Sequence, residues 1–180
     1  MENKNDIRSL TLDELISFFQ KNDLPSYKAN QVYNWLWKKS CLSFDKMTNI
    51  SIETRNLLKN KFVINHINID RFQKSIDGTI KNAIVLFDDL FVESVLIPTK
   101  SRTTACVSSQ VGCSLDCEFC ATSKMDRMRN LNPDEIYDQV ATINSQSLNY
   151  HGKPLSNIVF MGMGEPLLNY NNVIKGIEKI

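Results

Sequence analysis

The sequence predicts an α+β head of three helices and a small antiparallel sheet, followed by the start of an α/β unit. Three observations predict this order. Apolar residues recur at helical spacing in the first third of the chain, β-rich runs surround the Asp77-Gly78 turn, and strand and helix signals alternate beyond residue 103. We therefore divide the chain into domains at 1–100 and 101–180.

Composition excludes several classes of protein. Hydrophobic residues make up 42% of the 180 residues, which is enough for a packed core and argues against wholesale disorder. No apolar run approaches the ~20 residues that a membrane-spanning helix needs. The N-terminus, Met1 to Asp6, is polar and lacks the apolar stretch of a signal peptide. We therefore expect a cytoplasmic protein without a membrane partner.

Three helices are predicted in the head. Thr11 suits the N-cap of the first, because Glu14 stands where a capping box needs its second partner. Apolar residues then recur at helical spacing over the following turns. The second and third helices are expected over about 27–39 and 52–61.

Positive charge gathers in this head, although the whole chain has a net charge of only +1. Residues 21–61 hold eight Lys or Arg against three Asp or Glu, a local net charge of +5. Such a segment is either a solvated helical surface or a surface that contacts phosphates. Trp35 and Trp37 could stack on unpaired bases. Because they stand two residues apart on a helix, they point to different faces, and at least one is expected in the core.

Beyond the third helix the pattern becomes β-rich. Asp77-Gly78 is a strong hairpin signal, and apolar runs follow at 79–87 and 91–97. The segment from Pro98 to Arg102 is interpreted as a linker. These runs predict the small antiparallel sheet of the first domain.

The second domain is expected to alternate strands and helices. Its predicted elements are a strand at 104–108, a polar cysteine-bearing loop at 109–131, a helix, a strand at 157–161 and a helix from about Tyr170. Asn132-Pro133-Asp134-Glu135 is a well-formed helix start, with an Asn cap, Pro at the first helical position and acids in the first turn. The order is typical of a parallel α/β unit.

Three of the five cysteines, Cys113, Cys117 and Cys120, are clustered. This crowding does not suit a disulfide framework and points to metal or redox chemistry. Structural zinc usually takes four ligands, whereas three thiolates suit a four-iron cluster with one iron left open. Cys106 is a possible fourth ligand, but it lies on a predicted strand. A zinc module, an electron-transfer cluster and unliganded thiols stay open as alternatives.

The spacing Cys113-x-x-x-Cys117-x-x-Cys120, with Phe119 before the last cysteine, matches the signature of the radical S-adenosylmethionine (SAM) superfamily. The runs Cys106-Val-Ser-Ser-Gln-Val-Gly-Cys113 and Met161-Gly-Met-Gly-Glu-Pro-Leu-Leu-Asn169 resemble the RlmN/Cfr family of RNA methyltransferases. So do Asp77-Gly-Thr-Ile-Lys81 and the placement of Glu93 in Val92-Glu-Ser-Val-Leu-Ile-Pro98. The resemblance covers the chain from about Leu10.

This resemblance implies both a fold and an activity. It implies that residues 1–100 are an accessory RNA-binding domain and that residues 101–180 begin an α/β radical-SAM partial barrel. The implied reaction is methylation of adenine C2 in 23S ribosomal RNA and in transfer RNA, or of adenine C8 in the Cfr type. The implied cofactors are a 4Fe-4S cluster and two SAM molecules, acting through a methylated cysteine. An electron donor such as flavodoxin, a monomeric state and a disulfide bond are also implied.

The resemblance assigns roles to particular residues. It makes the three clustered cysteines the cluster ligands, Cys106 the thiol that resolves a protein–RNA adduct, and Glu93 a proton acceptor. Cys106 can also be read as a small buried apolar residue. Gly164 and Glu165 match a loop that contacts SAM: glycine lets backbone approach a ligand, and a carboxylate accepts hydrogen bonds from an ammonium group.

Three basic residues follow the cysteines closely. Lys124, Arg127 and Arg129 either face RNA phosphates or solvate a loop.

The sequence departs from the family pattern at its end. The chain stops at Ile180, and no cysteine follows Cys120. We therefore expect a truncated fragment that lacks the methyl-carrying cysteine, with an unpaired sheet edge. A non-catalytic RNA-binding remnant and a zinc-stabilised structural module are the alternatives.

Overall fold

The computed structural model describes residues 4–180, so the first three residues of the polar N-terminus lie outside it. The chain forms two compact units, one ending at Asn65 and the other covering His66–Ile180. The division lies well before the predicted boundary at residue 100. The reason is that the segment from Pro98 to Arg102 is a tight turn inside one sheet, closed by a hydrogen bond from Thr99 N to Arg102 O of 2.8 Å. Each unit is described by itself.

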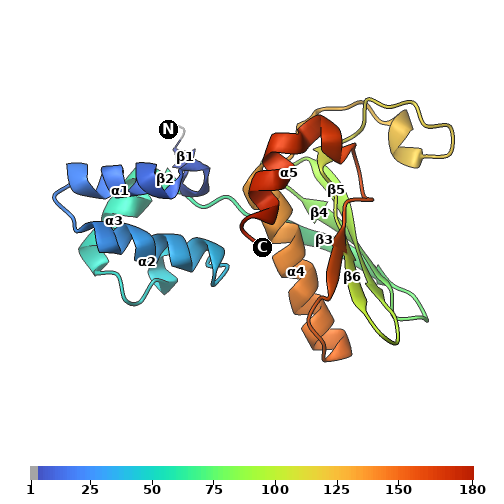
Figure 1. The fold of residues 1–180 in the computed structure, drawn as a ribbon, viewed down its shortest axis with the longest axis horizontal. Helices are drawn as coiled ribbons and strands as arrows, with labels where there is room; N and C mark the ends of the chain where they lie inside the picture. Colours follow the sequence, from blue (N-terminus) through green and yellow to red (C-terminus); the bar gives the residue numbers. More distant parts are fainter. Residues whose placement is uncertain (1–3) are drawn as a thin grey trace. The chain divides into compact units, whose positions relative to one another are not determined.

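The first unit is helical, as predicted (Figure 1). Its elements are β1 (Asn5–Asp6), η1 (Ile7–Ser9), α1 (Leu12–Lys21), α2 (Ser26–Trp37), η2 (Phe44–Lys46), α3 (Ile52–Lys61) and β2 (Phe62–Val63), and β1 pairs with β2 in parallel. The predicted capping box is present: Thr11 N donates to Glu14 Oε2 at 2.8 Å, and Glu14 N donates to Thr11 Oγ1 at 3.3 Å. Two orphan donors at the start of α1 are thereby satisfied.

The two tryptophans of α2 have different environments. Trp37 is buried at 5% exposure, whereas Trp35 is partly exposed. The Lys39 Nζ atom lies 3.7 Å from the centroid of the Trp35 ring, a cation–π contact. The prediction that at least one tryptophan belongs to the core is confirmed.

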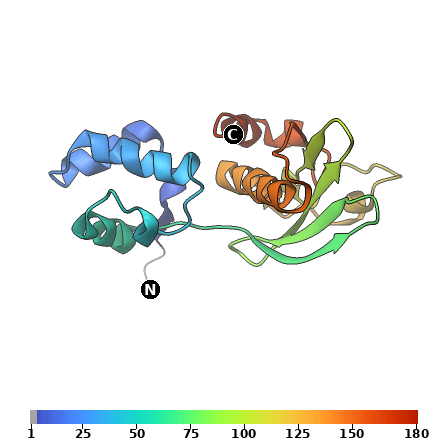
Figure 2. The ribbon, with the colours of Figure 1, turned by 90° about the horizontal axis from the view of Figure 1, so that it is seen from below.

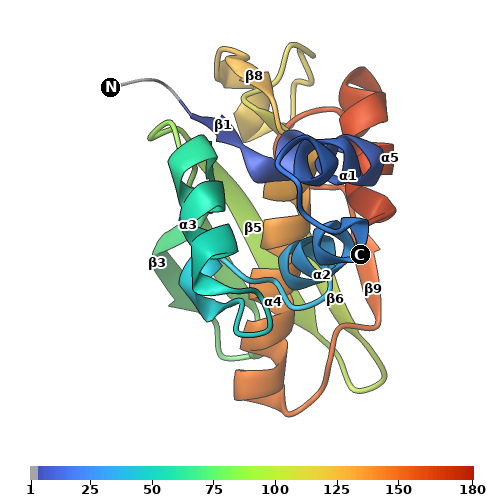
Figure 3. The same ribbon diagram turned by 90° about the vertical axis from the view of Figure 1, so that its left-hand side faces the viewer.

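The second unit is built on one five-stranded sheet rather than on two separate sheets. Its elements are β3 (Asn68–Lys74), β4 (Ile80–Val85), β5 (Phe91–Pro98), β6 (Thr103–Cys106), β7 (Gln110–Val111), η3 (Ala121–Lys124), β8 (Arg129–Asn130), α4 (Pro133–His151), β9 (Asn157–Val159), η4 (Pro166–Asn169) and α5 (Tyr170–Ile177). The strand order is β3-β4-β5-β6-β9. Neighbours from β3 to β6 are antiparallel, while β6 and β9 are parallel and lie side by side in Figure 3.

The predicted strand–helix–strand–helix unit is therefore confirmed, and the antiparallel strands extend its sheet. The hairpin predicted at Asp77-Gly78 joins β3 and β4, with Gly78 at φ +88°. That left-handed conformation favours glycine.

Helices α4 and α5 lie on the same side of this sheet (Figure 2). The buried strand residues that alternate along β4 and β5, among them Ile84, Val92 and Leu96, belong to the core. Because side chains alternate along a strand, Lys81, Glu93 and Val95 point to the opposite face. Their exposure is higher, which marks that face as the open one.

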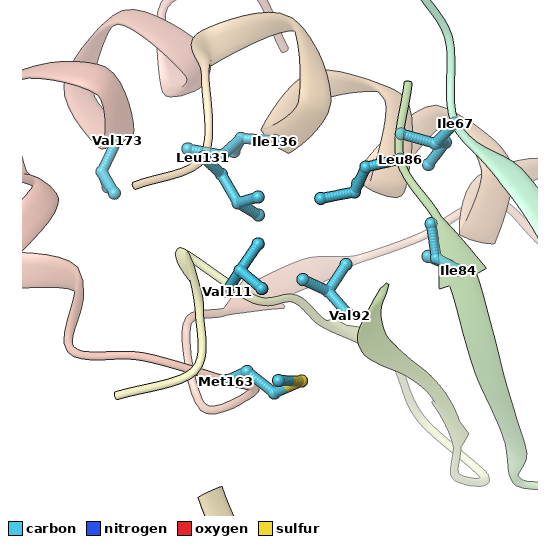
Figure 4. Packing of buried hydrophobic residues seen from close by; sticks show 9 residues of the cluster. All are labelled: Ile67, Ile84, Leu86, Val92, Val111, Leu131, Ile136, Met163 and Val173. Atoms are coloured by element: carbon cyan, nitrogen blue, oxygen red, sulfur yellow. The ribbon is translucent and has the colours of Figure 1, made fainter. Parts of the chain in front are cut away.

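One core cluster anchors the loops that carry the predicted site. It contains Ile67, Ile84, Leu86, Val92, Val111, Leu131, Ile136, Met163 and Val173 (Figure 4). Val111 and Leu131 flank the cysteine-bearing loop, and Met163 belongs to the glycine-rich loop after β9. Within residues 4–180, no helix is long and apolar enough to cross a membrane.

Candidate metal and cofactor site

The three clustered cysteines lie on a loop with a closed neck. Strands β7 and β8 pair antiparallel on either side of it, and Met128 N donates to Val111 O at 2.9 Å. Gly112 has φ +73°, and a Cβ placed there would lie 2.1 Å from Asp126 O. Only glycine fits where the two arms of the neck pass so closely.

The sulfur atoms occupy a partly exposed part of this loop. Leu115 N donates to Cys113 Sγ at 3.4 Å. The pKa of Cys120 is lowered, first by the backbone N–H of Thr122 and then by that of Ser123. Such donors favour the thiolate, the form that binds metals.

The chemical types of the ligands suit an iron–sulfur cluster, but the positions of the three sulfur atoms are not those of a metal site. Three thiols on one loop, with backbone N–H groups beside two of them, have the chemistry that such a cluster uses. In the described part of the chain, however, no group of three or more His, Cys, Asp or Glu side chains is placed to hold a metal ion. The loop supplies the ligand types without gathering them.

Cys106 stands apart from the three clustered cysteines. It ends β6, is 8% exposed, and its burial raises the pKa of its thiol. All five cysteines of the chain, which lie within the described residues, are free thiols. The structure therefore gives no support to the expected disulfide bond.

Glu93 and Cys106 share the open face of the sheet. Cys106 pairs with Val95 in the β5–β6 register, and Glu93 lies two residues from Val95 on the same strand. The Glu93 carboxylate forms an ion pair with Lys81 Nζ at 2.8 Å. A cavity of about 360 Å³ on this face is lined by Arg71, Phe72, Gln73, Lys81, Ala83 and Glu93. The sheet thus brings the two predicted catalytic residues onto one face of neighbouring strands.

The glycine-rich loop after β9 packs tightly against the chain that leads into the cysteine loop. A Cβ at Gly164, which has φ +88°, would lie 2.4 Å from Gln110 Cβ. The Glu165 carboxylate accepts a hydrogen bond from Leu167 N at 3.1 Å and so caps η4. Gly164 is therefore required by both backbone conformation and space.

Sequence reasoning missed the polar side chains that join these loops. Ser108 Oγ donates to Glu93 O at 2.6 Å and accepts from Met163 N at 2.8 Å. Gln110 Oε1 accepts from Glu165 N at 2.9 Å, and its Nε2 donates to Asn130 Oδ1 at 2.7 Å. The only sequence signal for these side chains was the polar run Ser108-Ser109-Gln110, which lies just before the first clustered cysteine.

Ser108 is in turn held by α4. Gln139 Oε1 accepts from Ser108 N at 2.8 Å, and Gln139 Nε2 donates to Ser108 O at 3.2 Å. Because Ser108 and Gln139 are fully buried, these bonds satisfy groups that water does not reach.

The basic residues after the cysteines are not equivalent. Arg129 binds two carboxylates, those of Asp88 and Glu135, so it is not available as a free phosphate contact. Arg127 donates to Asn130 Oδ1 at 3.1 Å and is exposed. Both interpretations stay open for Lys124 and Arg127.

Two family models match the chain. Residues 5–64 match the ribosomal RNA large subunit methyltransferase N-terminal domain, and residues 107–179 match the radical SAM superfamily. The matched regions are those of an RlmN-type N-terminal domain followed by a radical SAM region. The first matched region ends next to Asn65, where the first compact unit ends. The match to the N-terminal domain therefore covers the helical unit and leaves out the sheet.

Curated relatives agree with these matches. The chain is 68% identical to "Probable dual-specificity RNA methyltransferase RlmN" of Christiangramia forsetii and 62% identical to the protein of the same name from Flavobacterium johnsoniae. These matches cover 99% and 98% of the chain and 51% of each relative. The chain thus spans about half the length of the curated relatives it matches.

A solved structure supports the fold. The chain is similar to a radical SAM methyltransferase from Sphaerobacter thermophilus, with a TM-score of 0.83 and 34% identity. The match covers 96% of this chain and 51% of that chain. The predicted architecture, an α+β head of three helices and a small antiparallel sheet followed by the start of an α/β radical-SAM partial barrel, is confirmed.

Proposed function

We propose that this chain is part of a radical SAM enzyme that methylates C2 of adenine in 23S ribosomal RNA and in transfer RNA. The observation that carries the proposal is the three-cysteine loop, whose neck is joined by hydrogen bonds to the glycine-rich loop after β9. The relatives are named as dual-specificity RNA methyltransferases of the RlmN type, which favours C2 over the Cfr-type C8 reaction. Adenine C2 is not nucleophilic, so its methylation needs a radical route.

The cysteine loop would hold the cofactor. Cys113, Cys117 and Cys120 would bind a 4Fe-4S cluster, which supplies the electron that cleaves SAM to a 5′-deoxyadenosyl radical. Gly164 would let the backbone approach the ligand, and the Glu165 carboxylate would accept hydrogen bonds from the SAM ammonium group. Gln110 contacts both loops, and so would hold the SAM-binding loop beside the cluster loop.

The open face of the sheet would receive the adenine. Cys106, buried as a neutral thiol, would resolve the covalent protein–RNA adduct, and Glu93 would accept a proton from the adduct. The Lys81 ammonium group orients the Glu93 carboxylate through their 2.8 Å ion pair. Both side chains belong to strands, which hold a site more precisely than loops do.

The partners follow from this reaction. Ribosomal RNA and transfer RNA would be the substrates, and the head would contact their phosphates through its +5 segment. An electron donor such as flavodoxin would reduce the cluster.

The test is metal binding by cysteine variants. The chain is reconstituted anaerobically with iron and sulfide, and iron, sulfide and zinc are measured per chain. We expect iron and sulfide in the wild-type chain, their loss in Cys113→Ala, Cys117→Ala or Cys120→Ala, and their retention in Cys106→Ala and the control Cys41→Ala. Stoichiometric zinc in a colourless protein would support the structural-module alternative, and equal iron loss in the Cys41 variant would refute the ligand assignment.

A further inference from the structure

Arg129, at the exit of the cysteine loop, uses every hydrogen-bond donor that its side chain has. Its Nε and Nη2 donate to the two Asp88 oxygens at 2.6 and 2.9 Å. Its Nη1 and Nη2 each donate to a Glu135 oxygen at 2.8 Å, and Nη1 also donates to Asn130 O at 3.1 Å. A guanidinium group has five N–H donors, and all five are engaged in a fork geometry that lysine cannot reproduce.

The Arg129 guanidinium group and its two carboxylate partners form a partly buried group of interacting charges. The Glu135 side chain is only 3% exposed, and those of Arg129 and Asp88 are 24% and 28% exposed. Hydrogen bonds from Arg129 lower the pKa of Asp88, and the two carboxylates raise the pKa of Arg129. The guanidinium carbon also lies 5.2 Å from the centroid of the Phe87 ring. Partial burial makes these interactions stronger than those of a surface ion pair.

This arrangement joins three elements, of which only the β4–β5 turn is far from Arg129 in the sequence. Asp88 lies in the turn between β4 and β5, and Glu135 lies in the first turn of α4. Glu135 also accepts from Asn132 N at 2.8 Å and so caps α4. Arg129 therefore fastens the loop exit to the sheet on one side and to the helix on the other.

The hydrogen bonds of the cysteine-bearing tip are of a different kind. Cys120 N donates to Cys117 O at 3.0 Å, and Ser123 Oγ donates to both Cys117 O and Cys120 O. These bonds stay within the loop, so they shape the tip without fastening it to the sheet or to a helix. The position of the tip is therefore set at the neck, where Arg129 holds the outgoing arm.

We propose that Arg129 is a positioning residue that fixes the outgoing arm of the cysteine loop and thereby sets how firmly the loop retains its cluster. The inference rests on the proposed function, since it takes the loop to be the cluster site. When the arm is released, the two ends of the loop separate more easily, and a thiolate that has left the iron returns more slowly. Arg129 touches no ligand itself and acts through the loop.

The experiment measures how fast the reconstituted chain loses iron to a ferrous chelator under anaerobic conditions. The variants are Arg129→Lys, which keeps the charge but loses the fork, and Asp88→Asn, which leaves Glu135 paired. Arg127→Lys is the matched control, because Arg127 lies on the same arm and has one hydrogen bond to Asn130. A second control, Ile143→Val, lowers stability in the core away from the loop.

We expect iron release to accelerate about tenfold in Arg129→Lys, the lower end of the effect on metal affinity when a hydrogen-bond partner of a metal ligand is removed. Asp88→Asn should show a smaller acceleration, and Arg127→Lys should release iron at the wild-type rate. The melting temperature of each iron-free variant is measured in parallel. Ile143→Val should show a lower melting temperature without faster release.

Three outcomes separate the possible failures. If the wild-type chain takes up no iron, the proposed function fails. If the wild-type chain takes up iron but Arg129→Lys and Asp88→Asn release it at the wild-type rate, this inference is overturned and the cluster assignment stands. If Ile143→Val accelerates release as much as Arg129→Lys does, general stability explains the effect and the positioning role is wrong.

Discussion

At the scale of single residues, the cysteines divide into two environments. Cys106 is buried at the end of β6, where burial raises the pKa of its thiol. Cys120 is partly exposed, and backbone N–H groups lower the pKa of its thiol. The thiolate is the reactive form, so both exposure and pKa favour reaction at Cys120.

This difference predicts the order of alkylation in the metal-free chain. With iodoacetamide near neutral pH, Cys120 should be modified well before Cys106, as followed by peptide mass spectrometry. Raising the pH toward the raised pKa of Cys106 should increase the thiolate fraction of Cys106 and bring its alkylation rate closer to that of Cys120. Unfolding in urea removes both environments and should therefore abolish the difference in alkylation rate between Cys120 and Cys106. Equal rates in the folded chain would contradict the two environments.

Functional residues could be predicted from the sequence where they form a local motif. They could not be predicted where their role depends on contacts that form only in the folded chain. The cysteine spacing is local, so the sequence alone is enough to propose those three residues as ligands. Arg129, Ser108 and Gln110 depend on neighbours that lie far away in the sequence, such as Asp88 and Glu165. No local pattern distinguishes an arginine that binds two carboxylates from one that solvates a loop.

At the scale of elements, the glycine-rich loop gives a prediction with an internal control. Gly164→Ala should lower the free energy of unfolding by about 2 kcal/mol or more, because strain at φ +88° adds to a clash with Gln110 Cβ at 2.4 Å. Gly152→Ala meets nothing within 4 Å and has φ +65°, so it should cost only about 1 kcal/mol. Urea unfolding measures both, and equal decreases would show that the close packing on Gln110 is not rigid.

The elements also show where sequence reasoning ends. The start of α1 was predicted from its capping box, and that of α4 from its Asn cap, its proline and its first-turn acids, because these signals are local. The structure contains a capping box at both starts. The compact units divide at Asn65 and not at the predicted residue 100, because Pro98 to Arg102 has the composition of a linker but joins two paired strands. Pairing between β5 and β6 depends on tertiary contacts, which cannot be inferred from the residue composition of the turn between them.

At the scale of the whole molecule, the +5 segment lies entirely within the first compact unit. The full chain should therefore bind structured RNA with an affinity that falls as salt rises, since bound lysines release counterions from phosphates. Replacing the exposed Lys38 and Lys46 by Gln should reduce the slope of log K against log salt by up to about 0.9 for each phosphate that the variant no longer neutralises.

The control for this measurement is Lys153→Gln, at an exposed lysine of the second unit. Fluorescence anisotropy of a labelled RNA hairpin over a range of salt concentrations gives the slopes. The RNA-binding role of this segment would be refuted if the slope of log K against log salt were the same for the wild-type chain, the Lys38/Lys46 variant and the Lys153 variant. It would also be refuted if no chain bound RNA at low salt.

The most direct test of the central claim is the electron paramagnetic resonance spectrum of the reduced, reconstituted chain with and without SAM. A cluster held by Cys113, Cys117 and Cys120 leaves one iron without a protein thiolate, so SAM should change the spectrum. The Cys106→Ala variant should show the same change, because Cys106 is not a ligand. A cluster signal that SAM leaves unaltered, or a chain that holds only zinc, would contradict the claim that this loop serves radical SAM chemistry.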